Sequence, residues 1–423
     1  MICFNQFKDR SKTRLQKSAP TLKSQSKFNV SESERATSSC SATPPRRITE
    51  IYEEKAQNLR VFTFAELKQA TNNFNRLLKI GEGGFGCVYK GTINPPEGKA
   101  GDPMIVAIKK LSKDGCQGHK QWVAEVQILG VVDHPNLVKL IGYCAVDAER
   151  GIQRLLVFEY MPKKSLDEHI FNRAGSTLSW ERRLQIILGA AEGLAYLHEE
   201  LEIQVIYRDF KSSNILLDGE FKAKLSDFGL AREGPTAGHT HVSTAVVGTY
   251  GYAAPDYIET GHLTSKSDVW SFGVVVYEML TGRRSLEREL PKPEQKLLEW
   301  VKQNPADSRR FSMIIDPRLE NDYPLSAARK VAKLADSCLV RSGKERPKMS
   351  KVVEALKDII AEAAACVESP PVKYLEDAED SPAPAEQMAP SIKRRFTHLA
   401  KISENLDGVN TRRFMMMQRA KVT

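Results

Sequence analysis

Short apolar runs separated by glycine and proline mark the chain between residues 79 and 111. The segment KIGEGGFGCVYKG, residues 79–91, has strand-forming residues on both sides of a glycine-rich turn. A loop rich in chain-breaking residues, TINPPEGKAGDP, comes next, and the apolar run MIVAIKKL follows it. This order predicts a small antiparallel sheet in the first part of the folded region.

Helical periodicity takes over further along the chain. In LQIILGAAEGLAYLHEEL, Leu184, Ile187, Leu188, Ala191 and Leu194 recur on one helical face. The segment KSDVWSFGVVVYEMLTG is apolar on nearly all sides, which is typical of a buried helix. Strands followed by helices in a separate block predict an α+β fold with two lobes.

Hydrophobic density divides the chain into three parts. Residues 1–60, rich in Ser, Thr, Lys, Arg and Pro, are predicted to be a disordered basic segment. Residues 61–362 are predicted to fold as one domain with a short N-terminal extension, an N-lobe of about 75–160 and a C-lobe of about 161–362. Residues 363–423 are predicted to be a disordered tail that is first Pro-rich and acidic and then basic.

The formal net charge is +9, from 62 Lys and Arg against 53 Asp and Glu, and the excess lies in the two tails. Seven basic residues against one acidic residue give residues 1–27 a charge of +6, and eight against two give residues 391–423 the same charge. The middle of the chain therefore carries −3. A nucleic-acid-binding domain would carry its positive surface on the folded part, so no specific nucleic acid is expected. Solvated ends and attraction to an anionic membrane both stay open.

Membrane and disulfide signals are weak. The longest apolar run, WSFGVVVYEML, is too short to span a bilayer and contains Glu278. The basic N-terminus has no long apolar core after it, so it does not read as a secretory signal. Seven scattered cysteines without a C-x-x-C pair indicate reduced thiols inside a cell.

Gly81, Gly83 and Gly86 have the spacing G-x-G-x-x-G, which brings backbone N–H groups close to phosphate in two unrelated folds. A dinucleotide-binding turn would continue into an amphipathic helix, whereas the residues after Gly86 are β-formers. The pattern therefore favours a flap between two strands. Phe85 at its tip would shield phosphates from water, and Lys109 would supply a cation from the third strand.

Two polar segments, VIYRDFKSSNILLD and KLSDFGLAR, carry the candidate chemistry of phosphoryl transfer. Asp209 would orient an attacking hydroxyl and accept its proton. Asn214 and Asp227 would supply oxygen ligands for Mg²⁺. Lys109 would hold the α- and β-phosphates, and Glu125 in GHKQWVAEVQIL would hold Lys109.

Each of these residues has an ordinary structural explanation when it is taken alone. A lone Asp-Phe-Gly is commonly a turn, a buried-strand lysine usually snorkels, and a helical glutamate usually faces solvent. The chain, however, presents in order a glycine flap, Val-Ala-x-Lys, a helical Glu, Arg-Asp-x-Lys-x-x-Asn, Asp-Phe-Gly, Ala-Pro-Asp and Ser-Asp-Val-Trp-Ser-Phe-Gly. Order and spacing together predict a bilobal protein kinase.

Over about residues 60–362 the chain resembles the plant receptor-like cytoplasmic kinases of subfamily VII, which are similar to plant receptor kinases and the animal Pelle and interleukin-receptor-associated kinases. The resemblance is carried by FTFAELKQATNNF, GEGGFGCVYKG, HPNLVKLIGYC, LLVFEYMPKKSL, VIYRDFKSSNILLD and HVSTAVVGTYGYAAPDY. It implies a serine/threonine kinase that uses ATP with Mg²⁺ or Mn²⁺. It also implies protein substrates and upstream plasma-membrane receptor kinases, in immune or developmental signalling.

The resemblance implies an adenine site as well. Phe158 would be the gatekeeper, Glu159 to Met161 the hinge, and Val88 and Leu216 would sandwich the base. The residues expected to bind ATP are Ile80, Gly81, Glu82, Gly83, Gly84, Phe85, Gly86, Val88, Lys109, Glu125, Glu159, Met161 and Leu216.

The loop that follows Asp-Phe-Gly carries a predicted regulatory site. Arg208 can pair with a phosphate on Ser243 or Thr244, which would order this loop. That these two are merely polar loop residues stays open. Thr249 is expected to lie beside the catalytic aspartate and Lys211, where a Ser/Thr substrate docks.

Three departures from the kinase pattern stand out. Tyr207 replaces the usual histidine before Arg-Asp, as is common in this plant branch. Asp256 replaces the glutamate of Ala-Pro-Glu, and we expect its pair with Arg346 to be longer or looser, with weaker docking of the substrate-side loop. Ile2 stands where many relatives have the glycine that is myristoylated.

Cys3, flanked by apolar residues and followed by the basic run, is a candidate for S-palmitoylation, although a lone cysteine is as often a free thiol. One acyl chain anchors weakly, and basic residues add about 1 kcal/mol each near an anionic leaflet. We therefore expect peripheral attachment to the cytoplasmic face of the plasma membrane, with a cytosolic and nuclear pool.

Two other functions stay open from the sequence. The first is a catalytically silent pseudokinase scaffold, which a phosphate-transfer assay distinguishes from an active kinase. The second is nucleic-acid binding by the basic tails, which predicts salt-sensitive binding of the isolated tails.

Overall fold

The computed structural model describes residues 47–55, 59–83, 86–95, 101–112, 116–148, 151–172, 175, 177–236, 238–320 and 322–368. The predictions for residues 1–46 and 369–423, Cys3 included, lie outside these residues, as do those for Gly84 and Phe85. No helix in the part of the chain so described is long and apolar enough to cross a membrane.

The N-lobe is built on a six-stranded sheet with the strand order β1-β5-β6-β4-β3-β2. Its strands are β1 (Arg60–Val61), β2 (Lys79–Gly83), β3 (Gly86–Ile93), β4 (Met104–Leu111), β5 (Leu140–Ala148) and β6 (Gly151–Glu159). All neighbours pair antiparallel except β1, which runs parallel to β5. The predicted antiparallel sheet is therefore confirmed.

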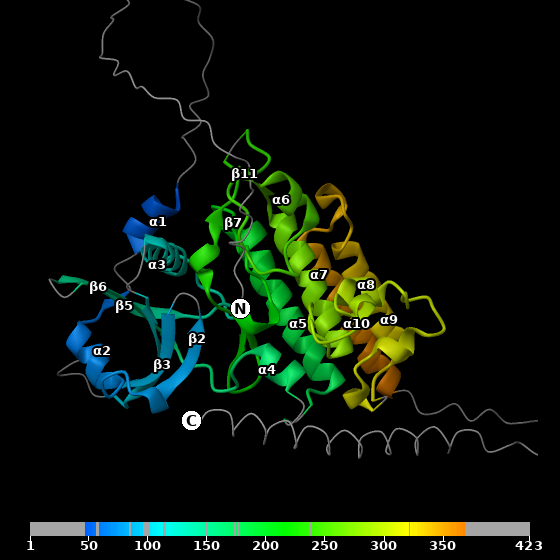
Figure 1. Ribbon diagram of the computed structural model, residues 1–423, viewed down its shortest axis with the longest axis horizontal. Helices are drawn as coiled ribbons and strands as arrows, with labels where there is room; N and C mark the ends of the chain where they lie inside the picture. The colour runs from blue at the N-terminus through cyan, green and yellow to red at the C-terminus, as the bar shows by residue number, and fades with distance from the viewer. Residues whose placement is uncertain are drawn as a thin grey trace, which may run out of the picture. The chain divides into compact units, whose positions relative to one another are not determined.

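Helices cover both faces of this sheet (Figure 1). They are α1 (Ile48–Lys55), α2 (Phe64–Ala70), the 3₁₀ turn η2 (Arg76–Leu78) and α3 (Cys116–Leu129). Side chains alternate between faces along a strand, so Leu155 and Val157 pack in the small core with Leu67 of α2. Leu156 and Phe158 point to the other face and join a larger core with α3.

The C-lobe is mainly helical. Its helices are α4 (Leu166–Phe171), α5 (Trp180–Ala195), the π-helical turn η3 (Tyr196–Glu200), α6 (Pro255–Thr260), α7 (Ser265–Thr281), α8 (Leu297–Val301), α9 (Leu325–Cys338) and α10 (Met349–Glu368). Its 3₁₀ turns are η4 (Ser212–Asn214), η5 (Phe228–Leu230), η6 (Lys292–Glu294), η7 (Phe311–Ile314), η8 (Pro317–Leu319) and η9 (Gly343–Glu345).

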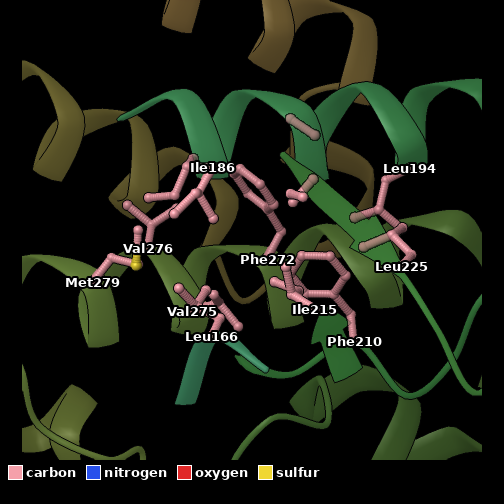
Figure 2. Close-up of a cluster of buried hydrophobic side chains, with 14 of the residues drawn as sticks. Leu166, Ile186, Leu194, Phe210, Ile215, Leu225, Phe272, Val275, Val276 and Met279 are labelled. Carbon is pink, nitrogen blue, oxygen red and sulfur yellow. The ribbon is translucent and has the colours of Figure 1, made fainter. Parts of the chain in front are cut away.

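Helix α7 is buried along nearly its whole length, as its apolar pattern predicts. Figure 2 shows Val276 beside Ile186 of α5 and Val275 beside Leu166 of α4. The Phe272 ring lies 5.7 Å from the ring of Phe210, which precedes η4. Sheet and helices thus form the predicted α+β bilobal fold.

Short strand pairs in the C-lobe hold the loops that carry polar side chains. These strands are β7 (Val205–Ile206), β8 (Ile215–Leu217), β9 (Ala223–Leu225), β10 (Arg232–Glu233), β11 (Val242–Ser243) and β12 (His262–Leu263). β7 pairs with β10, β8 with β9 and β11 with β12, all antiparallel. The segments around residues 209, 227 and 244 are therefore each anchored at a strand end.

The folded region extends beyond the predicted limits at both ends. Helix α1 lies within the segment predicted to be disordered, and α10 continues to Glu368, past residue 362. The apolar residues Ile48, Ile51 and Tyr52 have helical spacing, but a helix this short is stable only through tertiary packing. The composition of residues 1–60 therefore did not predict helix α1.

Candidate active site

Lys109 in β4 bonds one acidic side chain from each lobe. Its Nζ lies 2.5 Å from Oε1 of Glu125 on α3 and 2.8 Å from Oδ1 of Asp227. The glutamate is fully buried, and the lysine side chain is 13% exposed. Val88 lies opposite Lys109 across the β3–β4 ladder. The structure thus brings together four residues that the sequence analysis selected.

Burial and charge act against each other in this cluster. Burial lowers the pKa of Lys109, but the carboxylates of Asp227 and Glu125 outweigh it and hold that pKa above its ordinary value. Burial raises the pKa of Asp227, but Lys109 outweighs it and the net shift is downward. Burial raises the pKa of Glu125, and here Lys109 offsets it only in part. The cluster therefore holds a cationic lysine beside an ionised Asp227.

Asp209 is held by three side chains. Lys211 Nζ donates to its Oδ2 at 2.8 Å, Thr249 Oγ1 donates to its Oδ1 at 2.6 Å, and Asn214 Nδ2 donates to its Oδ2 at 3.1 Å. Lys211 also donates to the Thr249 hydroxyl at 2.9 Å. A buried carboxylate with this many donors is fixed in orientation.

Asp268 of α7 fixes the backbone just before Asp209 by accepting hydrogen bonds from it. Its carboxylate accepts the N–H groups of Tyr207 at 2.8 Å and Arg208 at 2.7 Å, and the ring of His198 lies 2.8 Å from it. Arg208 has φ of 73°, a conformation rare for a side-chain-bearing residue. Sequence reasoning did not assign a role to Asp268 or His198. The signal for Asp268 was a carboxylate in an otherwise apolar helix.

Tyr207 fills the place of the usual histidine. Its ring is buried and lies 5.0 Å from the ring of Phe228, and its hydroxyl donates to the carbonyl of Ser226. Burial raises the pKa of Tyr207 well above its ordinary value, so the hydroxyl stays a donor. This departure therefore joins the two loops that carry the candidate chemistry.

Asn214 and Asp227 sit on adjacent loops, because the Ser226 N–H donates to the Asn214 carbonyl at 2.9 Å. Asp227 has φ of 62°, so the chain turns sharply there into η5. The amide nitrogen of Asn214 faces Asp209, which leaves its amide oxygen for a cation. A carboxylate and an amide oxygen are a donor set that fits Mg²⁺. The described residues hold no group of three or more His, Cys, Asp or Glu that could hold a metal.

The residues expected around adenine lie on three elements. Val88 is on β3, Leu216 is on β8, and Met161 is buried directly after β6. The side chain of Glu159 is already engaged, since its Oε1 accepts from Lys224 Nζ at 2.8 Å and from the Lys139 N–H at 2.8 Å. The Glu159 N–H also donates to the Lys139 carbonyl at 3.1 Å, so neither its carboxylate nor its N–H is free for a ligand.

The glycine flap is formed by β2 and β3. Gly81 lies opposite Val88, Glu82 opposite Cys87, and Gly83 opposite Gly86. Gly86 has φ of 143°, and a Cβ there would lie 2.1 Å from the carbonyl oxygen of Lys110. Only glycine fits this position. Ile80, at the base of the flap, is 49% exposed.

Residues 74–356 match the family described as "Protein kinase domain". The chain belongs to the protein kinase family.

Curated relatives place it more closely. Serine/threonine-protein kinase PCRK1 of Arabidopsis thaliana is 60% identical over 306 residues, which cover 72% of this chain and 73% of that protein. Probable serine/threonine-protein kinase PBL20 of the same plant is 57% identical over 360 residues, covering 82% and 89%. Receptor-like cytoplasmic kinase 176 of Oryza sativa subsp. japonica is 50% identical over 326 residues, covering 76% and 81%. These matches confirm the resemblance to plant receptor-like cytoplasmic kinases and the assignment as a serine/threonine protein kinase.

In this kinase the arginine before the catalytic loop reaches one of the two expected phosphosites. Arg208 Nη2 donates to the Thr244 hydroxyl at 3.2 Å, and the guanidinium also bonds the Tyr257 hydroxyl and the Ala245 carbonyl. Ser243 is exposed on β11, opposite His262. The structure brings Arg208 to Thr244 and gives it no bond to Ser243 within the described residues.

The Asp256–Arg346 pair corrects an expectation. Arg346 Nη2 lies 2.6 Å from Asp256 Oδ1, and its side chain is fully buried. The other guanidinium nitrogens donate to the carbonyls of Val340 and Lys266, each at 2.8 Å. The expectation of a lengthened or loosened pair is therefore wrong, and Gly343 supplies the reason. A Cβ at Gly343 would lie 2.6 Å from Asp256 Oδ2, so its absence lets the two segments approach closely enough for the shorter carboxylate.

Proposed function

We propose that this kinase transfers the γ-phosphate of ATP to protein Ser and Thr hydroxyls, with Asp209 as the catalytic base. The observation that carries the proposal is the double cluster: Lys109 bonded to Glu125 and Asp227, next to Asp209 bonded to Lys211, Thr249 and Asn214. One cluster supplies a fixed cation for phosphates, and the other supplies a fixed base for a hydroxyl.

The role of each side chain follows from its surroundings. Lys109, held by Glu125, binds phosphate oxygens and balances their charge. Asp209 accepts the proton of the attacking hydroxyl, because its three donors fix the direction of its carboxylate. Lys211 bonds both Asp209 and the Thr249 hydroxyl, and we assign to its ammonium group the stabilisation of negative charge on the incoming phosphoryl group.

The cofactors proposed are ATP and Mg²⁺, with Mn²⁺ as a substitute. Asn214 and Asp227 would hold the metal, which neutralises phosphate charge when it is bound. The glycines of the flap, with Ile80, Glu82 and Phe85, would cover the nucleotide. Val88 and Leu216 would enclose the adenine, and the backbone of Glu159 to Met161 would read its edge.

The substrate class and the setting rest on the relatives. Their printed names describe serine/threonine-protein kinases and a receptor-like cytoplasmic kinase. We propose the same acceptor class here, and a role as a relay beneath plasma-membrane receptor kinases in immune or developmental signalling. The +6 charge of residues 1–27, together with acylation of Cys3, would attach the kinase to the inner leaflet, with a cytosolic and nuclear pool.

Phosphate transfer by the purified full chain tests the catalytic proposal. Wild type should label a generic Ser/Thr protein substrate from radiolabelled ATP and Mg²⁺, and Asp209→Asn should lose about 100-fold or more of the rate. Acid hydrolysis of the product should release phosphoserine or phosphothreonine. A wild-type protein that binds ATP but transfers no phosphate would instead support the pseudokinase scaffold.

Fluorescent fusions in plant cells test the location. Wild type should line the plasma membrane, while Cys3→Ser and a variant with residues 8–27 neutralised should both shift toward the cytosol. If all three proteins are equally diffuse, the proposed attachment is wrong and the basic tails act only as solvated ends.

A further inference from the structure

Helix α1 precedes the residues that match the kinase family and packs on α3, the helix that carries Glu125 (Figure 1). The match to the protein kinase family begins at residue 74, so α1 lies outside it. Two of its eight residues, Ile48 and Ile51, are only 5% and 7% exposed. Burial of this degree in so short a helix means that its contacts, and not its own propensity, hold it in place.

The first contact is with the end of α3. The ring of Tyr52 lies where a side chain on Gly130 would be, since a Cβ at Gly130 would sit 2.7 Å from Cε2 and 2.8 Å from Cδ2 of Tyr52. Tyr52 also hydrogen-bonds Tyr143 of β5, and burial with this neighbour raises the pKa of Tyr52 to about 12. The Tyr143 ring in turn meets the Trp122 ring of α3 edge-on, with centroids 5.4 Å apart. Tyr52 thus links α3 to the sheet.

The second contact is with the segment that follows Asp-Phe-Gly. The N–H of Ile48 donates to Oε1 of Glu233 in β10 at 3.1 Å. A cavity of about 450 Å³ lies between α3 and residues 231–242, and Ile48 forms part of its wall. Helix α1 therefore bridges α3 and the start of the regulatory segment across this cavity.

We propose that α1 is an in-cis brace that positions Glu125 for its bond to Lys109, with Tyr52 as the principal positioning residue. The reasoning is geometric. Glu125 reaches Lys109 only when α3 lies against the sheet, and α1 ties α3 to β5 at one end and to β10 at the other. Loss of the brace lowers the fraction of molecules with the Lys109–Glu125 pair formed, and activity falls with that fraction. The inference rests on the proposed function through the role of Glu125.

Four full-chain variants, with Glu125→Ala alone as the reference for the double variant, test the brace. Tyr52→Ala removes the ring from Gly130, Tyr52→Phe keeps the ring and loses only the hydroxyl, and Glu53→Ala changes an exposed residue of the same helix. Tyr52→Ala combined with Glu125→Ala asks whether both residues act through one pair. Each variant is measured for kcat, for KM of ATP and for amide hydrogen exchange.

Tyr52→Ala should lower kcat about tenfold, a shift of about 1.4 kcal/mol, and speed exchange in residues 116–129 and 231–236. Tyr52→Phe, which keeps the ring on Gly130 but loses the bond to Tyr143, should fall between wild type and Tyr52→Ala, and Glu53→Ala should stay within about twofold of wild type. In the Glu125→Ala background, Tyr52→Ala should lower kcat by less than about a further twofold.

Three results would overturn the brace: unchanged activity and exchange in Tyr52→Ala, a rise in exchange spread evenly over both lobes, or full additivity with Glu125→Ala. Exchange is read without catalysis. If wild type transfers no phosphate yet Tyr52→Ala frees residues 116–129 selectively, the proposed function fails and the brace stands.

Discussion

The Asp256 carboxylate lies 2.6 Å from the buried guanidinium of Arg346, and it occupies space that a side chain on residue 343 would fill. The loop that carries Arg346 and the start of α6 approach each other unusually closely as a result. Asp256 is one methylene shorter than the usual glutamate, and the glycine at residue 343 leaves the space that its carboxylate occupies. Because α6 directly follows the segment that carries Thr244 and Thr249, this match bears on how that segment is held.

Gly343→Ala should therefore weaken the kinase through its substrate loop. The added Cβ would fall 2.6 Å from Asp256 Oδ2, and displacing that carboxylate partly unpairs a buried Arg346. We expect a loss of about 1–3 kcal/mol in stability, measured by denaturant unfolding. We also expect a larger rise in KM for protein substrate than in KM for ATP.

Gly219→Ala is the matched control, since its nearest contact would be at an ordinary 4.0 Å. Asp256→Glu, which restores the common kinase residue, should give no gain, because the Asp256–Arg346 pair already closes at 2.6 Å and Asp256 Oδ2 already lies 2.6 Å from the position of a Cβ on Gly343. Higher activity in Asp256→Glu would show that the close approach is a defect and not a match.

Lys109→Met and Asp227→Ala should each lower phosphate transfer about 100-fold or more, since each removes a preorganised charge with no local substitute. Both side chains belong to the buried cluster with Glu125, so thermal unfolding must show that the fold survives. Lys120→Met, an exposed lysine on α3, is the matched control and should retain wild-type rates. Autophosphorylation that persists at the wild-type rate in Asp227→Ala would contradict the assignment.

The order of motifs was sufficient to predict the two lobes and the candidate site, because phosphoryl transfer restricts which residues can occupy those positions. Lys109, Glu125 and Asp227 are far apart in the sequence yet form one cluster. Contacts that depend on packing were not predictable in this way. Two contacts are of this kind: the Tyr52 ring packs on Gly130, and the Asp256 carboxylate packs on Gly343. Each requires two segments to approach closely, and no local sequence pattern encodes that distance.

The two expected phosphosites should differ in effect, although the sequence treats them alike. Arg208 already donates to the Thr244 hydroxyl at 3.2 Å, so a phosphate there gains charge-assisted bonds without moving the loop. Thr244→Ala should lower kcat about tenfold, the scale of one hydrogen bond to a charged group. Ser243→Ala should change it by less than about threefold.

Phosphopeptide mass spectrometry beside kinetics checks this prediction, because it shows whether each site is filled in the wild type. A stronger effect of Ser243→Ala than of Thr244→Ala would reverse the assignment. Equal activity in the wild type and the double variant Ser243→Ala/Thr244→Ala would mean that both are simply polar loop residues.

Glu278 at the end of α7 should make stability depend on pH. It is fully buried, its Oε1 accepts from the Tyr252 hydroxyl at 2.7 Å and from the Ser285 N–H at 2.8 Å, and burial raises its pKa to about 7. An acid whose pKa is raised on folding binds its proton more tightly in the native state. Its contribution is therefore fully present below its unfolded pKa, near 4.5, and is lost as pH rises through 7. Glu278→Gln, which mimics the neutral acid, should exceed wild type in stability by less than about 1 kcal/mol near pH 5 and by up to about 3 kcal/mol near pH 8. Urea unfolding at both pH values measures the difference, with the exposed Glu289→Gln as control. A Glu278→Gln effect that does not change with pH would mean that this carboxyl is ionised throughout and that its pKa is not raised.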